Sequence, residues 1–168
     1  MNRELVNDVR AFRNALGQFA TGVAVIVAEV DGIRLATTVS SFNSVSLTPP
    51  LVLFSLARSA LSFELWQRVD QFAVTVLSGN QAEMSNRFAR AGTDKWLDVE
   101  VITGRNGVPL LPGALAHFEC STHARYDGGD HQIVVGHVDH FTVADIKEVG
   151  PLIFYAGQYR SLASTLSA

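Results

Sequence analysis

The sequence contains a single cysteine, Cys120, among its 168 residues. One cysteine excludes an internal disulfide framework and is typical of chains that work in a reducing compartment. We therefore expect a cytoplasmic protein. Cys120 itself is interpreted as a small buried apolar residue, because free cysteine is among the most buried residue types.

The chain also lacks an excess of basic charge and a long apolar run. It has 13 Lys and Arg against 16 Asp and Glu, for a formal net charge of -3, and its basic residues are scattered singly. Nucleic-acid binders gather basic residues on one face, so we expect no nucleic-acid partner. No apolar run approaches the roughly 20 residues of a membrane helix, so we expect no membrane partner. The segment MNRELVNDVR lacks the apolar stretch of a signal peptide.

Several catalytic motifs are absent as well. Without a G-x-G-x-x-G motif the chain is not expected to be a Rossmann domain, and without G-x-S-x-G it lacks the nucleophile elbow of serine hydrolases. His137 and His140 are separated by an odd number of positions, which places them on opposite faces of a strand. His131 and His137 share a face but would stand about 20 Å apart, too far to bind one ion. No metal site is expected.

What the chain does contain is a series of β-rich segments separated by turns. "GVAVIVAEVDGIRLATTVSSF" has two such runs joined by Asp31-Gly32, a strong hairpin signal. Residues 114–143 predict a long hairpin with its turn at 127–130. Further strands are predicted over 51–57, 71–78 and 151–157, with a short one possible at 99–103.

Three helices interrupt these strands. The spacing of Leu5, Val9, Phe12, Leu16 and Phe19 predicts one apolar stripe on a helix over 5–19. Shorter helices are predicted over 60–69 and 80–89. Trp66 is interpreted as a core or dimer-interface residue rather than a stacking platform. It falls on the face of its helix away from Leu61 and Leu65, which leaves the interface role open.

No regular alternation of strands and helices occurs, so hairpin-linked antiparallel strands are the natural arrangement. Curling such a sheet into a barrel removes its exposed edges. We predict a mainly β fold, a small closed antiparallel barrel with a few flanking helices, formed by residues 1–168 as one domain.

A polar ribbon at residues 37–48 carries seven Ser and Thr hydroxyls and Asn43 between two apolar runs. Such residues often fill strand edges and turns. They can equally line a site for a flat, heteroatom-rich ligand such as a flavin ring. Arg58, Ser59 and the start of the next helix could bind a phosphate, although Arg58 could also be a solvated surface charge.

At this point the residues resemble those of the flavin reductase family, the small reductase components of two-component flavin-dependent monooxygenases. The resemblance runs from about Phe12 to Leu162. It is carried by five segments in order: "FRNALGQFATGVAVIVA", "ATTVSSFNSVSLTPPLVLFSLARSALSF", "FAVTVLSGNQAEMSNRFA", "YDGGDHQIVVGHV" and "PLIFYAGQYRSL".

The resemblance implies an FMN-binding split β-barrel of Greek-key type that acts as a homodimer. It implies an NAD(P)H:flavin oxidoreductase that reduces FMN or FAD with NADH or NADPH and supplies a separate flavin-dependent monooxygenase component. The implied flavin-binding residues are Thr37, Thr38, Val39, Ser40, Ser41, Phe54, Ser55, Leu56, Ala57, Arg58, Ser59 and Phe88. His131 is implied at the reaction centre as the catalytic residue. The implied nicotinamide pocket comprises His131, Tyr155, Tyr159 and Arg160, although Ala156 stands where the family more often has His.

Two other functions remain open from the sequence. One is a non-catalytic flavin-binding or storage module, which would not need the GGDH motif around His131. The other is a flavin-dependent oxidase related to pyridoxamine-phosphate oxidase, which calls for a cluster of basic residues. Only Arg58, Arg87 and Arg90 stand near the relevant segments. The sequence does not separate FMN from FAD, and only the lack of a clear site for a 2′-phosphate favours NADH over NADPH.

Overall fold

The computed structural model describes residues 8–92, 94–145 and 149–162. Its helices are α1 (Val9–Leu16), α2 (Phe63–Trp66) and α3 (Ala82–Ala89). Its strands are β1 (Thr21–Gly22), β2 (Ala24–Val30), β3 (Ile33–Val39), β4 (Asn43–Leu47), β5 (Pro50–Ala57), β6 (Gln71–Val76), β7 (Ile102–Thr103), β8 (Pro109–Leu110), β9 (Ala116–Gly128), β10 (His131–Val143), β11 (Ile153–Tyr155) and β12 (Gln158–Arg160).

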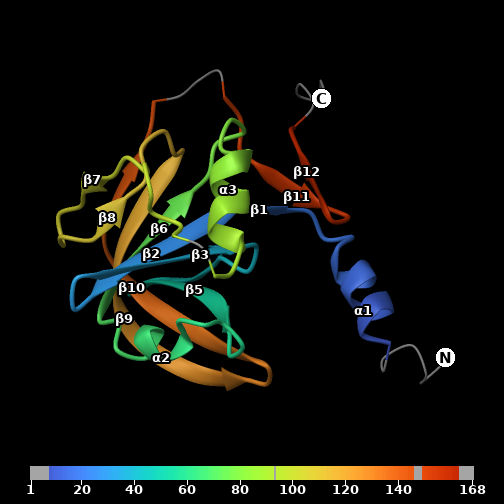
Figure 1. The fold of residues 1–168 in the computed structure, drawn as a ribbon, viewed down its shortest axis with the longest axis horizontal. Helices are drawn as coiled ribbons and strands as arrows, with labels where there is room; N and C mark the ends of the chain where they lie inside the picture. Colours follow the sequence, from blue (N-terminus) through green and yellow to red (C-terminus); the bar gives the residue numbers. More distant parts are fainter. Residues whose placement is uncertain (1–7, 93, 146–148, 163–168) are drawn as a thin grey trace.

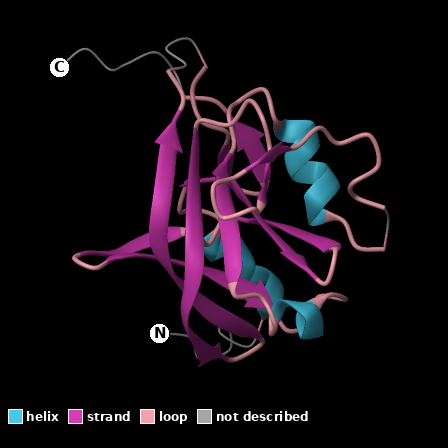
Figure 2. Ribbon diagram, turned by 90° about the vertical axis from the view of Figure 1, so that its left-hand side faces the viewer, coloured by secondary structure: helices cyan, strands magenta, loops and turns pink. Residues whose placement is uncertain are grey.

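A seven-stranded antiparallel sheet in the order β3-β2-β6-β9-β10-β5-β4 dominates the fold (Figure 2). Its two edge strands, β3 and β4, are consecutive in the chain and are joined only by residues 40–42. The sheet must therefore curl until its edges approach each other. Within that link the Ser41 hydroxyl bonds to β5, since its Oγ accepts the Ser55 N–H at 2.9 Å. The mainly β, antiparallel prediction is confirmed, and among the described residues no strand ladder joins β3 to β4.

Both predicted hairpins are confirmed. Asp31 and Gly32 have φ of 51° and 76°, the left-handed conformation that a two-residue turn requires, and they join β2 to β3. β9 and β10 form the long hairpin, with a turn at Gly129–Asp130. Such turns are local in sequence, which explains why residue types alone located them.

Two apolar cores lie on the two faces of the sheet. One is built around Phe54, Phe72 and Trp66, and the other lies beneath α3 around Phe88, Leu77 and Leu111. β2 contributes side chains to both cores, so it is buried on both faces. Burial raises the pKa of the Cys120 thiol to about 12, with the charges of Asp139 and Glu119 adding to the effect, so its interpretation as a buried apolar residue is confirmed.

Of the two places considered for Trp66, the structure confirms the core. Its side chain is only 3% exposed and packs edge-on against Phe54, with 6.2 Å between ring centroids. The reason is that the predicted 60–69 helix is only the single turn of α2, which aims the indole into the core.

Other elements also differ from the predictions. α1 begins at Val9, with Asp8 accepting hydrogen bonds from the Arg10 and Ala11 N–H groups, and Leu5 lies outside the described residues. The polar ribbon contains a strand, β4. The 151–157 segment is half of a hairpin, β11–β12, that pairs with β1 in a small separate sheet. In the described ranges no helix is both long and apolar enough to cross a membrane.

Candidate functional site

A cavity of about 570 Å³ opens between the edge strand β3 and the end of β5. One wall is the edge of β3, and the facing wall is the end of β5 with the turn after it. α2 and the loop that follows α3 complete it. Thr37, Ala57, Ser59 and Phe88 line this cavity, so it unites four of the predicted flavin-binding residues from three separate segments.

The β3 wall offers backbone hydrogen-bonding groups. β3 pairs with β2 on one side, and within the described residues no other strand pairs with its second side. Residues 33–37 of that free edge line the cavity, and the Arg34 carbonyl accepts the Trp96 indole N–H at 3.1 Å. An edge strand presents a row of N–H and C=O groups to whatever lies beside it. This wall can therefore recognise a flat ligand with polar atoms along one side.

Lys95 supplies positive charge to the cavity. Its Nζ donates to the Phe88 carbonyl at 3.0 Å, which uses one of its three donors. Desolvation by burial lowers its pKa below the usual range for lysine. Arg34 also lines the cavity but is paired with Glu29 and lies over the Trp96 ring. Lys95 and the Ser59 hydroxyl are thus suited to hold an anionic group.

Trp66 adds an unused donor. Its side chain lines the cavity, and its buried indole N–H has no hydrogen-bond partner among the described residues. A buried N–H without a partner is costly, so such an atom points to an acceptor that a bound molecule can provide.

Arg58 does not face this cavity as the sequence had suggested. Its Nε donates to the Gly129 carbonyl at 3.0 Å and its Nη2 to Asp127 Oδ1 at 2.6 Å. The guanidinium therefore lies against the β9–β10 turn. The helix start predicted after Ser59 is also wrong, because residues 58–62 form turns and α2 begins only at Phe63.

His131 lies on the strand next to the cavity wall. It is the first residue of β10 and stands directly opposite Ala57 of β5, so the two side chains project from the same face about 5 Å apart. Its Nδ1 is 2.7 Å from Asp130 Oδ1. The hydrogen bond and charge of His131 lower the pKa of Asp130, which favours its ionised form. The contact holds one ring nitrogen and leaves Nε2 for a ligand.

A second group of polar residues gathers on α3. The Tyr159 hydroxyl lies 2.7 Å from Ser85 Oγ and donates to Asn86 Oδ1 at 3.2 Å. Thr38 Oγ1 donates to the Ser85 carbonyl at 2.7 Å. Thr38 and Tyr159, predicted for flavin and nicotinamide respectively, are thus brought to the same short helix.

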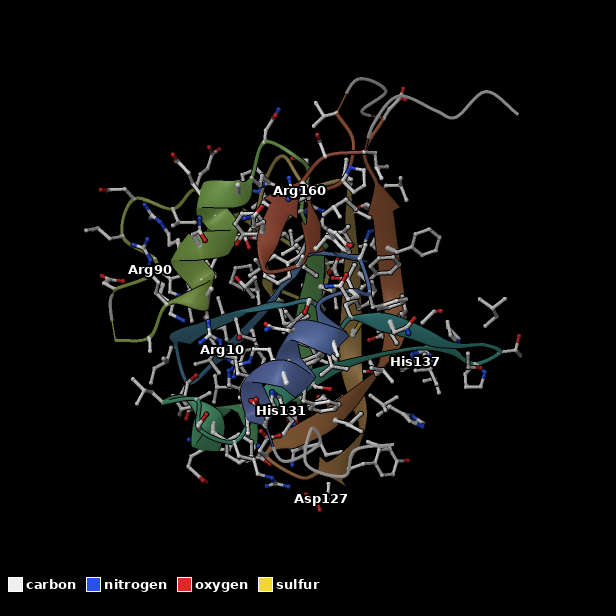
Figure 3. All side chains as sticks on the ribbon, turned by 90° about the vertical axis from the view of Figure 1, so that its right-hand side faces the viewer. Arg10, Arg90, Asp127, His131, His137 and Arg160 are labelled. Carbon is white, nitrogen blue, oxygen red and sulfur yellow. The ribbon has the colours of Figure 1, made fainter. Side chains whose placement is uncertain are left out.

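The remaining predicted residues lie in several places. Phe54 and Leu56 point into the core, and Val39 is buried there too. Ser41 and Ser55 bond to each other, while Ser40 lies in the short link between β3 and β4. Tyr155 donates to Gln18, and Arg160 to Gln158. Figure 3 shows Arg160 and His131 well apart, so one chain does not bring these two predicted nicotinamide residues together.

Sequence reasoning missed Lys95, Trp66 and the free edge of β3. Lys95 follows a glycine-containing loop with no periodic pattern, so nothing in the sequence linked it to Ser59. Among the described residues no group of three or more His, Cys, Asp or Glu is arranged to hold a metal ion.

Comparisons with known proteins agree with this geometry. The model of the flavin reductase like domain matches residues 16–163. The reductase subunit HsaB of a flavin-dependent monooxygenase from Rhodococcus jostii is 39% identical over 92% of this chain and 78% of its own length. The FMN reductase (NADH) SmoA of Agrobacterium fabrum is 43% identical over 89% of this chain and 84% of its own.

Solved structures share the fold as well. The NADH:FAD oxidoreductase SgcE6 of Streptomyces globisporus, in complex with NAD and FAD fragments, superimposes with a TM-score of 0.89 at 34% identity and covers 96% of both chains. The styrene monooxygenase flavin reductase of Pseudomonas putida gives a TM-score of 0.82 at 34% identity, covering 92% of this chain and 99% of that one.

Proposed function

This chain belongs to the flavin reductase family, and on that premise we propose that it is an NADH-dependent flavin reductase. It reduces FMN or FAD and supplies the reduced flavin to a separate flavin-dependent monooxygenase. Two observations on relatives support this: several are named as reductase subunits of such monooxygenases, and others carry NADH in their names.

The observation that carries the proposal is the cavity beside β3. A flavin is flat and carries ring nitrogens and carbonyls along one side, with a phosphate on a flexible chain. The free backbone edge of β3 fits the first feature, and Ser59 with Lys95 fits the second. The partnerless indole N–H of Trp66 adds a donor for a ligand acceptor.

The reaction transfers a hydride from C4 of the dihydronicotinamide to N5 of the flavin. The protein contributes by stacking the two rings and by stabilising the negative charge that develops on the flavin ring. N–H groups along β3 are the donors for that charge. His131, beside Ala57 at the cavity wall, would bind the nicotinamide carboxamide or hold a proton at Nε2, while Asp130 holds Nδ1.

The test follows absorbance at 340 nm as purified protein oxidises NADH with FMN, with FAD or without flavin. Loss of NADH that saturates with added flavin supports a reductase, and the lower KM identifies the preferred flavin. Flavin binding without NADH oxidation, using either NADH or NADPH, would instead support the alternative, a non-catalytic flavin-binding or storage module.

We also propose that the enzyme works as a homodimer. The apolar stripe predicted for the first helix is exposed on α1, where Phe12 is 53% and Phe19, just beyond the helix, 78% exposed. α1 stands away from the sheet (Figure 1) and buries none of its residues. Contiguous exposed apolar surface of this kind marks an interaction site. A second copy would also explain how Arg160 and His131 could serve one nicotinamide, because one chain keeps them apart.

The proposed reaction suits the cytoplasm, where NADH is made and where the thiol of Cys120 stays reduced. The residues assigned to the nicotinamide by the family resemblance, Tyr155, Tyr159 and Arg160, remain predictions. Tyr159 is the most constrained of them, because Ser85 and Asn86 both hold its hydroxyl.

A further inference from the structure

Arg58 joins the end of β5 to the turn of the β9–β10 hairpin through three contacts. Its Nε donates to the Gly129 carbonyl at 3.0 Å and its Nη2 to Asp127 Oδ1 at 2.6 Å. Its backbone N–H donates to the Asp130 carbonyl at 2.9 Å. The guanidinium also lies over the Phe63 ring, 5.7 Å from its centroid. One residue therefore holds the turn through its side chain and its backbone.

The same turn determines where His131 lies. Asp130 holds the His131 ring at Nδ1, and His131 follows Asp130 directly. Both carboxylates of the turn are open to solvent, with the Asp127 side chain 80% and the Asp130 side chain 93% exposed. Exposed loop tips move on fast timescales unless something ties them down. Arg58 ties this tip to the end of β5, beyond the last paired residues His131 and Ala57.

We propose that Arg58 is a positioning residue: it holds the β9–β10 turn against the end of β5 and thereby fixes the His131 imidazole beside the cavity wall at Ala57. The inference builds on the proposed reductase function and replaces the flavin-phosphate role that the sequence had suggested for Arg58. A phosphate at the guanidinium would have to displace both Asp127 and the Gly129 carbonyl. Lys95 and Arg90, which both line the cavity, are cations available for that phosphate.

A positioning role differs from a stabilising one in what it changes. Ion pairs between exposed groups contribute little to global stability. A displacement of about 1 Å at a reacting group can still lower a rate by about a hundredfold. Loss of Arg58 should therefore act on the nicotinamide step and leave the unfolding transition nearly unchanged.

The chain contains a matched control. Arg68 pairs with Asp31 at the β2–β3 turn, so it also links an arginine to an aspartate at a two-residue hairpin turn. That turn carries no predicted site residue. Arg68→Gln removes the same kind of contact without touching the turn before His131.

The experiment measures steady-state kinetics of Arg58→Gln, Asp127→Asn, the double variant and Arg68→Gln. We expect Arg58→Gln to lower kcat/KM for NADH by about tenfold or more, with KM for flavin changed less than about twofold. Asp127→Asn should change the same parameter in the same direction. The double variant should be no worse than Arg58→Gln, because both substitutions remove the same Arg58–Asp127 contact. Arg68→Gln should match the wild type.

Two results would overturn the inference. A tenfold rise in KM or Kd for flavin in Arg58→Gln, with normal NADH kinetics, would make Arg58 a phosphate ligand. Wild-type kinetics in Asp127→Asn would show that the Arg58–Asp127 contact does not affect catalysis. The Asp127→Asn variant distinguishes the positioning role from the phosphate-binding role, because a carboxylate does not bind phosphate.

Hydrogen exchange of backbone amides tests the inference independently of activity. Arg58→Gln and Asp127→Asn should both speed exchange across residues 128–131, whereas Arg68→Gln should not. Unchanged exchange in both variants would overturn the positioning role even if the enzyme were active. If both variants exchange faster but the wild-type protein does not oxidise NADH, Arg58 still holds the turn and the proposed reductase function is wrong.

Discussion

β3 and β4 are the two edge strands of one sheet, yet their free edges have different surroundings. The β3 edge borders a cavity that α2 and the loop after α3 enclose. β4 is mostly exposed, and Leu47 at its end is 90% exposed. A free strand edge is a liability unless it is covered or used. The contrast supports the proposal that the β3 edge binds a ligand, while the exposed apolar residues of α1 fit the proposed contact with a second copy of the chain.

Filling the cavity would remove the difference between the two edges. Ala57→Leu adds bulk to the wall opposite β3, next to His131. We expect kcat/KM for flavin to fall by about a hundredfold, since a displaced ring loses its alignment. Initial rates against flavin concentration measure this. Ala57→Ser, which stays small, should retain activity within about threefold, and equal losses in both variants would contradict the cavity assignment.

A charge on α1 would test whether its exposed apolar residues form the proposed dimer contact. Phe12→Asp places a carboxylate on the exposed apolar stripe. We expect the dimer to weaken by about 2 kcal/mol, roughly thirtyfold in Kd, because the charge would be buried without a partner. Light scattering over a concentration series gives the mass. Asn14→Asp puts the same group on the polar face of α1 and should leave the dimer intact; dissociation of both variants would place the interface elsewhere.

Removing positive charge from the cavity should have a smaller effect. Lys95→Met should raise Kd for FMN by about tenfold, as expected for losing a charge-assisted hydrogen bond to phosphate. Arg105→Met, on an exposed residue outside this cavity, serves as the control. Wild-type affinity in Lys95→Met would exclude the phosphate role.

The pH dependence sharpens the same test. Burial lowers the pKa of Lys95, so its charge is present at low pH and is lost as pH rises through that lowered value, earlier than for an ordinary lysine. Affinity for FMN should therefore weaken on the alkaline side. Lys95→Arg keeps its charge throughout, so its affinity should stay level where that of the wild type falls. Parallel curves for the two proteins would point to another ionisable group.

The smallest expected effect concerns the hydrogen bond between Ser41, in the link after β3, and Ser55 of β5. Ser41→Ala removes the acceptor of the Ser55 N–H, which should lower the free energy of unfolding by about 1 kcal/mol. Urea denaturation measures this difference. Ser44→Ala, on an exposed serine of β4, should change it by less than about 0.5 kcal/mol. A loss as large for Ser44 as for Ser41 would mean that the Ser41–Ser55 hydrogen bond contributes nothing particular to stability.

Local patterns predicted most of the fold. The two hairpins, the strands over 51–57 and 71–78 and the third helix follow from turn residues and apolar spacing, and the structure has them. The second helix was predicted too long because apolar spacing cannot show that the turns at 58–62 precede it. β12 was missed because its three residues carry no alternation of their own.

The candidate site was predicted only in part. Thr37, Ala57, Ser59 and Phe88 do meet at one cavity, but Lys95 joins them from a loop that no motif marks. Arg58 and Ser59 are neighbours in sequence and yet face different parts of the molecule. The chain turns at these residues after β5 ends, so a pair that looked like one phosphate site is divided between the cavity and the β9–β10 turn.

The sequence by itself determined the fold class, the hairpin turns and the membership of the flavin reductase family, because these depend on residue types at short spacing and on motifs in order. Only the tertiary structure decided that Arg58 holds the turn before His131 and that Lys95 reaches the cavity. Each of these contacts joins segments far apart along the chain. Their geometry depends on how the whole sheet curls, and no local pattern of residues encodes that curvature.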